Sequence, residues 1–189
     1  MFRLTHEEKT FLLRLARRSL EAAVRGERME APLVFPPALG NPGGAFVTLH
    51  RNGSLRGCVG YILPVKPLYK TVMEAAAAAA LHDTRFPEVI PDELSGLEVE
   101  ISVLSPCQEV RLEEIQVGVH GLMVSQGFAR GLLLPQVAVE RDWTPLRFLE
   151  ETCRKAGLPP AAWRRGAKIE AFTAEVFSEH TLAVEELRS

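Results

Sequence analysis

Apolar residues recur at helical spacing in three stretches of the chain. Between residues 11 and 23 they follow Thr5 and Glu8, which have the spacing of a capping box at a helix start. Residues 68–80 carry an apolar stripe that ends in a run of alanines, and such small side chains predict close approach of a neighbouring element. A third stripe covers residues 146–156. We therefore predict three helices, each with one buried face.

Alternating apolar and polar residues predict strands between these helices. Asn52-Gly53 and Gln126-Gly127 each separate two such stretches, which is typical of a β-hairpin. Residues 97–103 and 169–177 alternate in the same way. Because no strand–helix unit repeats, the pattern predicts an α+β fold with an antiparallel or mixed sheet and flanking helices. Residues 1–189 suit one domain, or two lobes that share the chain, with the N- and C-terminal segments in the larger lobe.

The first hairpin has two alternative registers, which place its side chains on different faces. A two-residue turn at Asn52-Gly53 would pair His50 with Leu55 and turn Cys58 to the opposite face. A three-residue loop closed by a glycine bulge would place His50, Arg56 and Cys58 on one face. That register also pairs Thr48 with Arg56 and collects the apolar side chains on the other face, namely those of Val47, Leu49, Leu55 and Val59. Because it separates polar from apolar side chains, we predict the bulged loop.

Composition and charge narrow the class of protein. Hydrophobic residues make up 47% of the chain and the net charge is −2, which argues against a surface wholly given to nucleic-acid binding. Cys58, Cys107 and Cys153 lie far apart and form no Cys-x-x-Cys pair, so they predict neither a disulfide framework nor a zinc finger. Reduced cysteines favour a cytoplasmic location. No apolar run is long enough to span a bilayer, so we expect no membrane association.

The stretch Leu-Arg-Gly-Cys-Val-Gly at residues 55–60 resembles the signature of the AMMECR domain family, with Val59 where the family usually has isoleucine. Thr84 and Glu88 stand where the family usually has proline, so the loop that holds them is expected to be less rigid here. Further motifs similar to those of the family follow in order at residues 83–87, 102–106, 120–122, 131–136, 148–158 and 163. Relatives in this family resemble partners of a Memo-like protein and of a radical SAM enzyme. The resemblance does not identify a cofactor.

The signature stretch is the candidate site. Cys58 is the candidate reactive residue, and Arg56 offers a planar fork for a carboxylate or phosphate. Gly57 and Gly60 would let a ligand or another backbone approach closely. Further candidates are the bases His50, His82 and His120, the orienting carboxylate Asp83, and the ligand-binding side chains of Arg85, Phe86 and Gln136.

Three kinds of function are compatible with these residues. The first is an enzyme or small-molecule-binding protein with a cleft beside residues 55–60. The second is a binding or adaptor module without turnover, acting with the Memo-like and radical SAM partners that the resemblance implies. Nucleic-acid association through the arginines of the first helix is the weakest alternative, because the net charge does not favour it.

Overall fold

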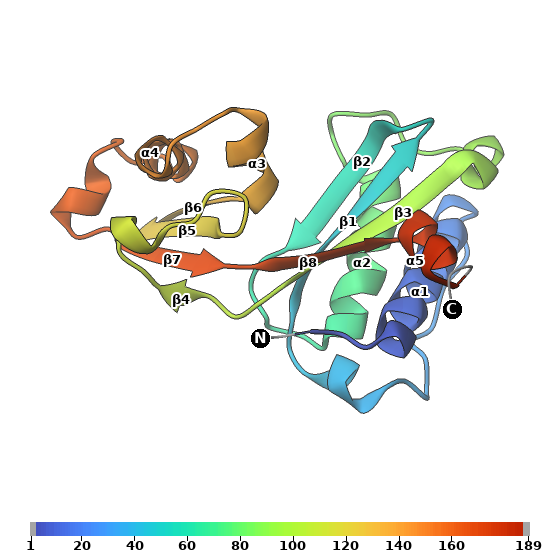
Figure 1. Ribbon diagram of the computed structural model, residues 1–189. Coiled ribbons are helices and arrows are strands. Elements are labelled where there is room, and N and C mark those ends of the chain that lie inside the picture. The colour runs from blue at the N-terminus through green and yellow to red at the C-terminus, as the bar shows by residue number, and fades with distance from the viewer. Residues whose placement is uncertain (1–2, 187–189) are drawn as a thin grey trace. The chain divides into compact units, whose positions relative to one another are not determined.

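The computed structural model describes residues 3–186, and the chain divides into two compact units. The first unit comprises Met1–Leu104 with Glu175–Ser189, and the second comprises Ser105–Ala174. Each unit contains a four-stranded sheet and helices, which confirms the α+β prediction (Figure 1). No helix among residues 3–186 is long and apolar enough to cross a membrane.

The first unit is built on a sheet with strand order β2-β1-β3-β8. The helices α1 and α2 cover one face of this sheet (Figure 1). The strands are β1 (Gly44–Arg51), β2 (Ser54–Tyr61), β3 (Leu97–Leu104) and β8 (Ala174–Ser178), and the helices are α1 (His6–Val24), α2 (Leu68–Leu81), α5 (Glu179–Glu186) and the 3-10 turns η1 (Pro37–Gly40) and η2 (Pro91–Gly96). The predicted capping box at the start of α1 is present, because Thr5 and Glu8 exchange hydrogen bonds with each other's backbone N–H groups.

The register of the β1–β2 hairpin differs from the prediction. His50 pairs with Leu55, and Asn52 and Gly53 form a two-residue turn with φ of 52° and 76°. The three-residue loop is therefore wrong. The bulge lies further along β2, where Arg56 is the extra residue between the pairs Leu49–Gly57 and His50–Leu55. A bulge adds one residue to one strand, so it shifts every later side chain of β2 to the other face.

Because of this bulge, part of the predicted separation of side chains is still found. Thr48 pairs with Cys58, and His50, two residues further along β1, shares their face. The pair Val47–Val59 lies on the opposite face. Two residues leave their predicted places: Leu55 joins the face of His50, and Arg56 does not pair with Thr48.

The helix-covered face of the sheet holds the core of the first unit. The fully buried residues of β1 and β3 on this face include Ala45, Val47, Leu49, Val99 and Ile101. At Gly57, a Cβ atom would lie 2.2 Å from the carbonyl oxygen of Ala79 on α2. The alanine-rich surface of α2 therefore approaches β2 closely, as its sequence predicts, and only glycine fits opposite it.

The second unit contains a sheet with strand order β4-β7-β5-β6. Its elements are β4 (Gln108–Glu109), η3 (Leu112–Glu114), β5 (Gly121–Gln126), β6 (Ala129–Leu133), α3 (Pro135–Glu140), α4 (Pro145–Lys155), η4 (Ala162–Arg165) and β7 (Lys168–Phe172). Helix α4 packs on β5 and β6, and its Phe148 and Leu149 are fully buried. The single strand predicted over residues 169–177 is two strands, β7 and β8, which belong to different sheets.

Candidate functional site

Cys58 lies on the face of the first sheet that the helices leave uncovered. It is half-buried, and its sulfur accepts a hydrogen bond from the Thr48 hydroxyl at 3.3 Å. Thr48 pairs with Cys58 on one side and with Glu100 of β3 on the other. Three neighbouring strands therefore present a thiol, a hydroxyl and a carboxylate in one row, which we call the polar row.

The loop after α2 contacts Cys58 through the edge of β2. Asp83 accepts the Cys58 backbone N–H at 2.8 Å, and Arg85 Nη2 donates to the Cys58 carbonyl oxygen at 3.4 Å. Arg85 also forms a two-pronged ion pair with the Asp83 carboxylate, with N–O distances of 2.9 and 2.6 Å. The Arg85 guanidinium, with the N–H groups of Cys58 and Arg85, holds the pKa of Asp83 well below its usual range.

This arrangement keeps Asp83 charged and orders the loop against an edge strand. The Asp83 side chain is only 7% exposed, whereas that of Arg85 is 56% exposed. The Arg85 guanidinium lies 5.5 Å from the centre of the half-buried Phe86 ring. Arg85 is therefore the cation beside Cys58 that can still be reached from solvent.

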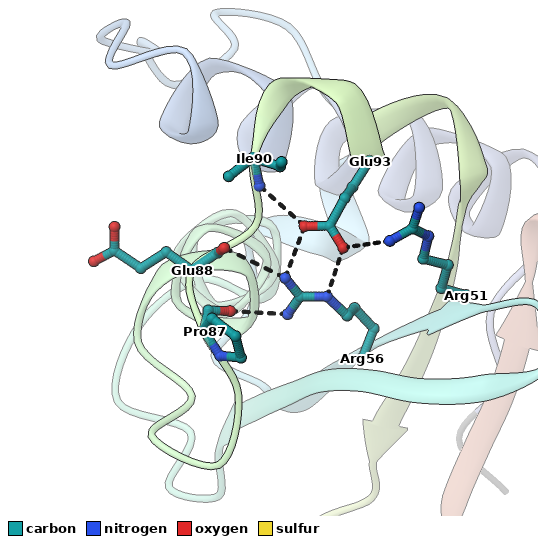
Figure 2. A network of polar contacts seen from close by, with 6 residues as sticks. All are labelled: Arg51, Arg56, Pro87, Glu88, Ile90 and Glu93. Atoms are coloured by element: carbon teal, nitrogen blue, oxygen red, sulfur yellow. Dashed lines mark hydrogen bonds and ion pairs between the residues drawn. The ribbon is translucent and has the colours of Figure 1, made fainter.

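Arg56 points to the edge of the hairpin, where its guanidinium meets Glu93 of η2 (Figure 2). The two side chains form a fork, with Nε–Oε1 and Nη2–Oε2 distances of 2.9 and 2.8 Å. Arg56 also donates to the carbonyl oxygens of Pro87 at 2.9 Å and Glu88 at 3.3 Å. Every nitrogen of the guanidinium is thus engaged within the chain, so the fork predicted to hold a ligand anion holds Glu93.

Glu93 has two further donors. Arg51 Nη1 lies 2.7 Å from its Oε1, and the Ile90 N–H donates to Oε2 at 3.1 Å (Figure 2). The hydrogen bonds from Arg56, with those from Ile90 and the charge of Arg51, lower the pKa of Glu93 to about 2. The carboxylate is therefore charged at any ordinary pH.

The candidate histidines lie in different parts of the chain. His50 shares the face of Cys58, and its Nε2 is 3.9 Å from Oε1 of Glu100. His82 is the exposed residue at the C-terminal cap of α2. His120 and Gln136 belong to the second unit, where His120 Nδ1 accepts the backbone N–H of Gln116 at 3.2 Å and Gln136 is exposed. Within the first unit, His50 is the histidine that lies with the polar row on the uncovered face of the sheet, which we call the polar face.

Gly57 and Gly60 both lie at close contacts within the chain. Gly57 faces α2, as described above. At Gly60, a Cβ atom would lie 2.3 Å from the ring of Phe46, its partner on β1. Gly60 therefore makes room for an aromatic ring on the same face as Cys58.

No pattern in the sequence marks Glu93 or Glu100 as part of this site. Both carboxylates come from segments that are remote in sequence from Cys58, and each resembles an ordinary solvated glutamate. The sequence signal for Glu93 is its position three residues after Ile90 at the start of a turn, where a glutamate can accept the first N–H. Among residues 3–186, no group of three or more potential metal-binding side chains comes together.

The fold defines an α+β protein in which residues 55–60 lie on the edge strand of the first sheet. The family model for AMMECR1 matches residues 13–177, and the chain belongs to this family. Protein PF1979 of Pyrococcus furiosus is 46% identical over 192 residues, covering 95% of this chain and 91% of the relative. A protein of Methanothermobacter thermautotrophicus is 44% identical, covering 93% of this chain and 96% of the relative.

A solved structure has the same fold. The crystal structure of the uncharacterized protein PH0010 from Pyrococcus horikoshii matches with a TM-score of 0.82 and 43% sequence identity. The match covers 92% of this chain and 91% of the other.

Proposed function

We propose that the polar face around Cys58 binds a small molecule and that the Cys58 thiol is the group that reacts with it. The observation that carries the proposal is the hydrogen bond from the Thr48 hydroxyl to the Cys58 sulfur. A fixed donor aimed at sulfur is suited to the negative charge that a cysteine carries as a thiolate, the nucleophilic form, before it attacks a carbon.

Cys107 and Cys153 lack this environment. Burial raises the pKa of both thiols, and Cys153 is fully enclosed in the core of the second unit. Cys58 instead has a solvent-accessible guanidinium, that of Arg85, bonded to its own carbonyl group. Arg85 replaces Arg56 as the residue that we propose binds an anionic part of the ligand. Its Nε and Nη2 pair with Asp83, but its side chain is 56% exposed, so a carboxylate or phosphate of a ligand can still reach the guanidinium.

The reaction that these groups support is addition of the thiol across a polarised double bond. Sulfur forms a bond to the carbon, and the thiol proton is carried to the other atom of the double bond. We propose His50 as the proton carrier, oriented by Glu100 at 3.9 Å. His82 and His120 remain alternative proton carriers; His82 is exposed at the end of α2.

The experiment is untargeted mass spectrometry of molecules retained by the protein after incubation with the low-mass fraction of a cell extract. Wild type and Cys58→Ser are compared, with Cys107→Ser as the matched control. We expect at least one molecule that wild type and Cys107→Ser retain and Cys58→Ser loses. Equal retention by all three proteins, or retention by none, contradicts the proposal.

A non-catalytic binding module is the second candidate, favoured by the position of β2. This strand lies at the edge of its sheet, and its Leu55 and Tyr61 are 41% and 37% exposed. An edge strand is a common docking site for another chain, and Leu55 and Tyr61 lie on either side of the Cys58 position that the loop after α2 covers. Memo-like and radical SAM proteins are the partners proposed from the family resemblance, and a Leu55→Glu variant that keeps its fold should lose such a partner while retaining small molecules.

A further inference from the structure

We infer that Arg56 and Glu93 are positioning residues for Cys58: their ion pair holds the bulge that turns the thiol toward the polar face. The inference deepens the proposed function, since it concerns the same thiol.

The bulge decides which way Cys58 faces. The two-residue turn pairs Arg51 with Ser54 and His50 with Leu55. If that register continued without a bulge, Leu49 would pair with Arg56 and Val47 with Cys58. The thiol would then lie on the helix-covered face, beside the buried Val47, and not next to Thr48. One extra residue, Arg56, reverses this outcome.

Arg56, the extra residue, is held by hydrogen bonds on two edges of its guanidinium. One edge meets the Glu93 carboxylate, and the other donates to the carbonyl oxygens of Pro87 and Glu88 (Figure 2). Arg56 and Glu93 are 14% and 11% exposed in their side chains, so this pair is largely shielded from solvent. A partly buried, two-pronged ion pair is geometrically specific, which is what fixing a register requires.

The same contacts hold the loop that reaches Cys58. Residues 87 and 88 are bonded to Arg56, and four residues before Pro87 the Asp83 carboxylate accepts the Cys58 N–H. From the helix side, the contact between Gly57 and Ala79 supports the same register. The Arg56–Glu93 pair thus fixes two segments that adjoin Cys58. One is the bulge that precedes Cys58 on β2, and the other is the loop that binds its backbone N–H.

The test measures hydrogen exchange at the Cys58 amide in the full-length protein. In Glu93→Ala the Asp83 bond to this amide loosens, and we expect its exchange to be about tenfold faster than in wild type. The NMR contact between the Hα atoms of Thr48 and Cys58 should weaken in the same sample, because these atoms are close only in the bulged register.

Glu175→Ala is the matched control. Glu175 is 18% exposed, pairs with Lys9 at 2.8 Å and accepts the Leu4 N–H at 2.9 Å, so it resembles Glu93 in burial and partners. We expect exchange at Cys58 to stay within about threefold of wild type in this variant. Acetate, which supplies the CH2–COO− group that the substitution removes, should slow the exchange of Cys58 again in Glu93→Ala, whereas chloride at equal ionic strength should not.

Unchanged exchange at Cys58 in Glu93→Ala, or an equal increase at every amide of the first unit, would overturn the inference. If Glu93→Ala does not fold, Glu93→Gln provides the same measurement with the side-chain volume kept. The two proposals fail separately. If the protein retains a small molecule at Cys58 but exchange at the Cys58 amide is unchanged in Glu93→Ala, only the positioning role is lost. If exchange is faster in Glu93→Ala but no small molecule is retained, only the proposed function is lost.

Discussion

Cys58 is held through its backbone from one side and through its thiol from the other. Asp83 and Arg85 bind its N–H and carbonyl groups, and Thr48 donates to its sulfur. A residue fixed at both ends presents its side chain in one direction, which a reactive thiol requires. The residues that achieve this come from β1 and from the loop after α2.

Glu93 leads to a prediction about acid stability. Its pKa is lowered from 4.5 to about 2 by Arg56, by the Ile90 N–H and by Arg51. Arg56 also donates to the carbonyl oxygens of Pro87 and Glu88. A carboxyl group whose pKa is lowered by folding stabilises the folded state above its unfolded pKa, and this contribution is lost as the pH falls through the lowered value. We therefore expect the loss to occur between about pH 4.5 and pH 2.

The measurement is denaturant-induced unfolding of wild type and Glu93→Gln across that pH range. The free energy of unfolding should fall more steeply with decreasing pH in wild type than in Glu93→Gln. The pKa of Asp83 is also lowered in the folded protein, so Asp83 contributes to the same decrease in the free energy of unfolding. Part of the pH dependence therefore remains in Glu93→Gln. Glu114→Gln is the control, because Glu114 also has a lowered pKa but is exposed and screened by solvent. Parallel curves for wild type and Glu93→Gln would contradict the prediction.

At the scale of elements, the contact between α2 and β2 is the most tightly constrained. In Gly57→Ala the new methyl group would lie 2.2 Å from the carbonyl oxygen of Ala79, so helix and strand must move apart. We expect a loss of about 1–3 kcal/mol in the free energy of unfolding. Gly96→Ala is the control, since the nearest atom there, Arg51 Nε, is 4.0 Å away, and its effect should stay within about 0.5 kcal/mol. Equal urea midpoints for the two variants would show that the contact is not tight.

The hairpin shows how far sequence reasoning reaches for one element. The requirement that polar and apolar side chains separate was correct for Thr48, His50 and Cys58, but the bulge was expected in the turn. Asn52 and Gly53 both adopt left-handed backbone angles, which suits a two-residue turn and moves the bulge to Arg56. Its position there depends on Glu93 and Ala79, which no local pattern of β1 or β2 reveals.

Other elements followed from local signals alone. Thr5 and Glu8 mark the start of α1, and the alanines of α2 indicate its close packing. The break between β7 and β8 at Thr173 had no such signal, because alternation continues through it while the strand changes sheets. The contact of Asp83 with Cys58 joins residues 25 positions apart, and spacing alone does not predict it.

At the scale of the whole molecule, each unit has its own apolar core. Phe148 is fully buried among residues of the second unit, and Val72 is fully buried in the first. Phe148→Ala should cost about 3–5 kcal/mol. In hydrogen exchange we expect the second unit to lose protection while β1 and α2 keep theirs. Val72→Ala is the reciprocal control, and loss of protection in both units from either substitution would show that they unfold as one.

The central claim, that a small molecule binds at Cys58, is tested most directly by the rate at which iodoacetamide modifies this residue. Peptide mass spectrometry gives the rates of Cys58 and Cys107 in the same sample, so Cys107 serves as the internal reference. We predict that the low-mass fraction of a cell extract slows modification of Cys58 and leaves that of Cys107 unchanged. A Cys58 rate that is the same with and without the extract, at saturating extract concentration, would contradict the account.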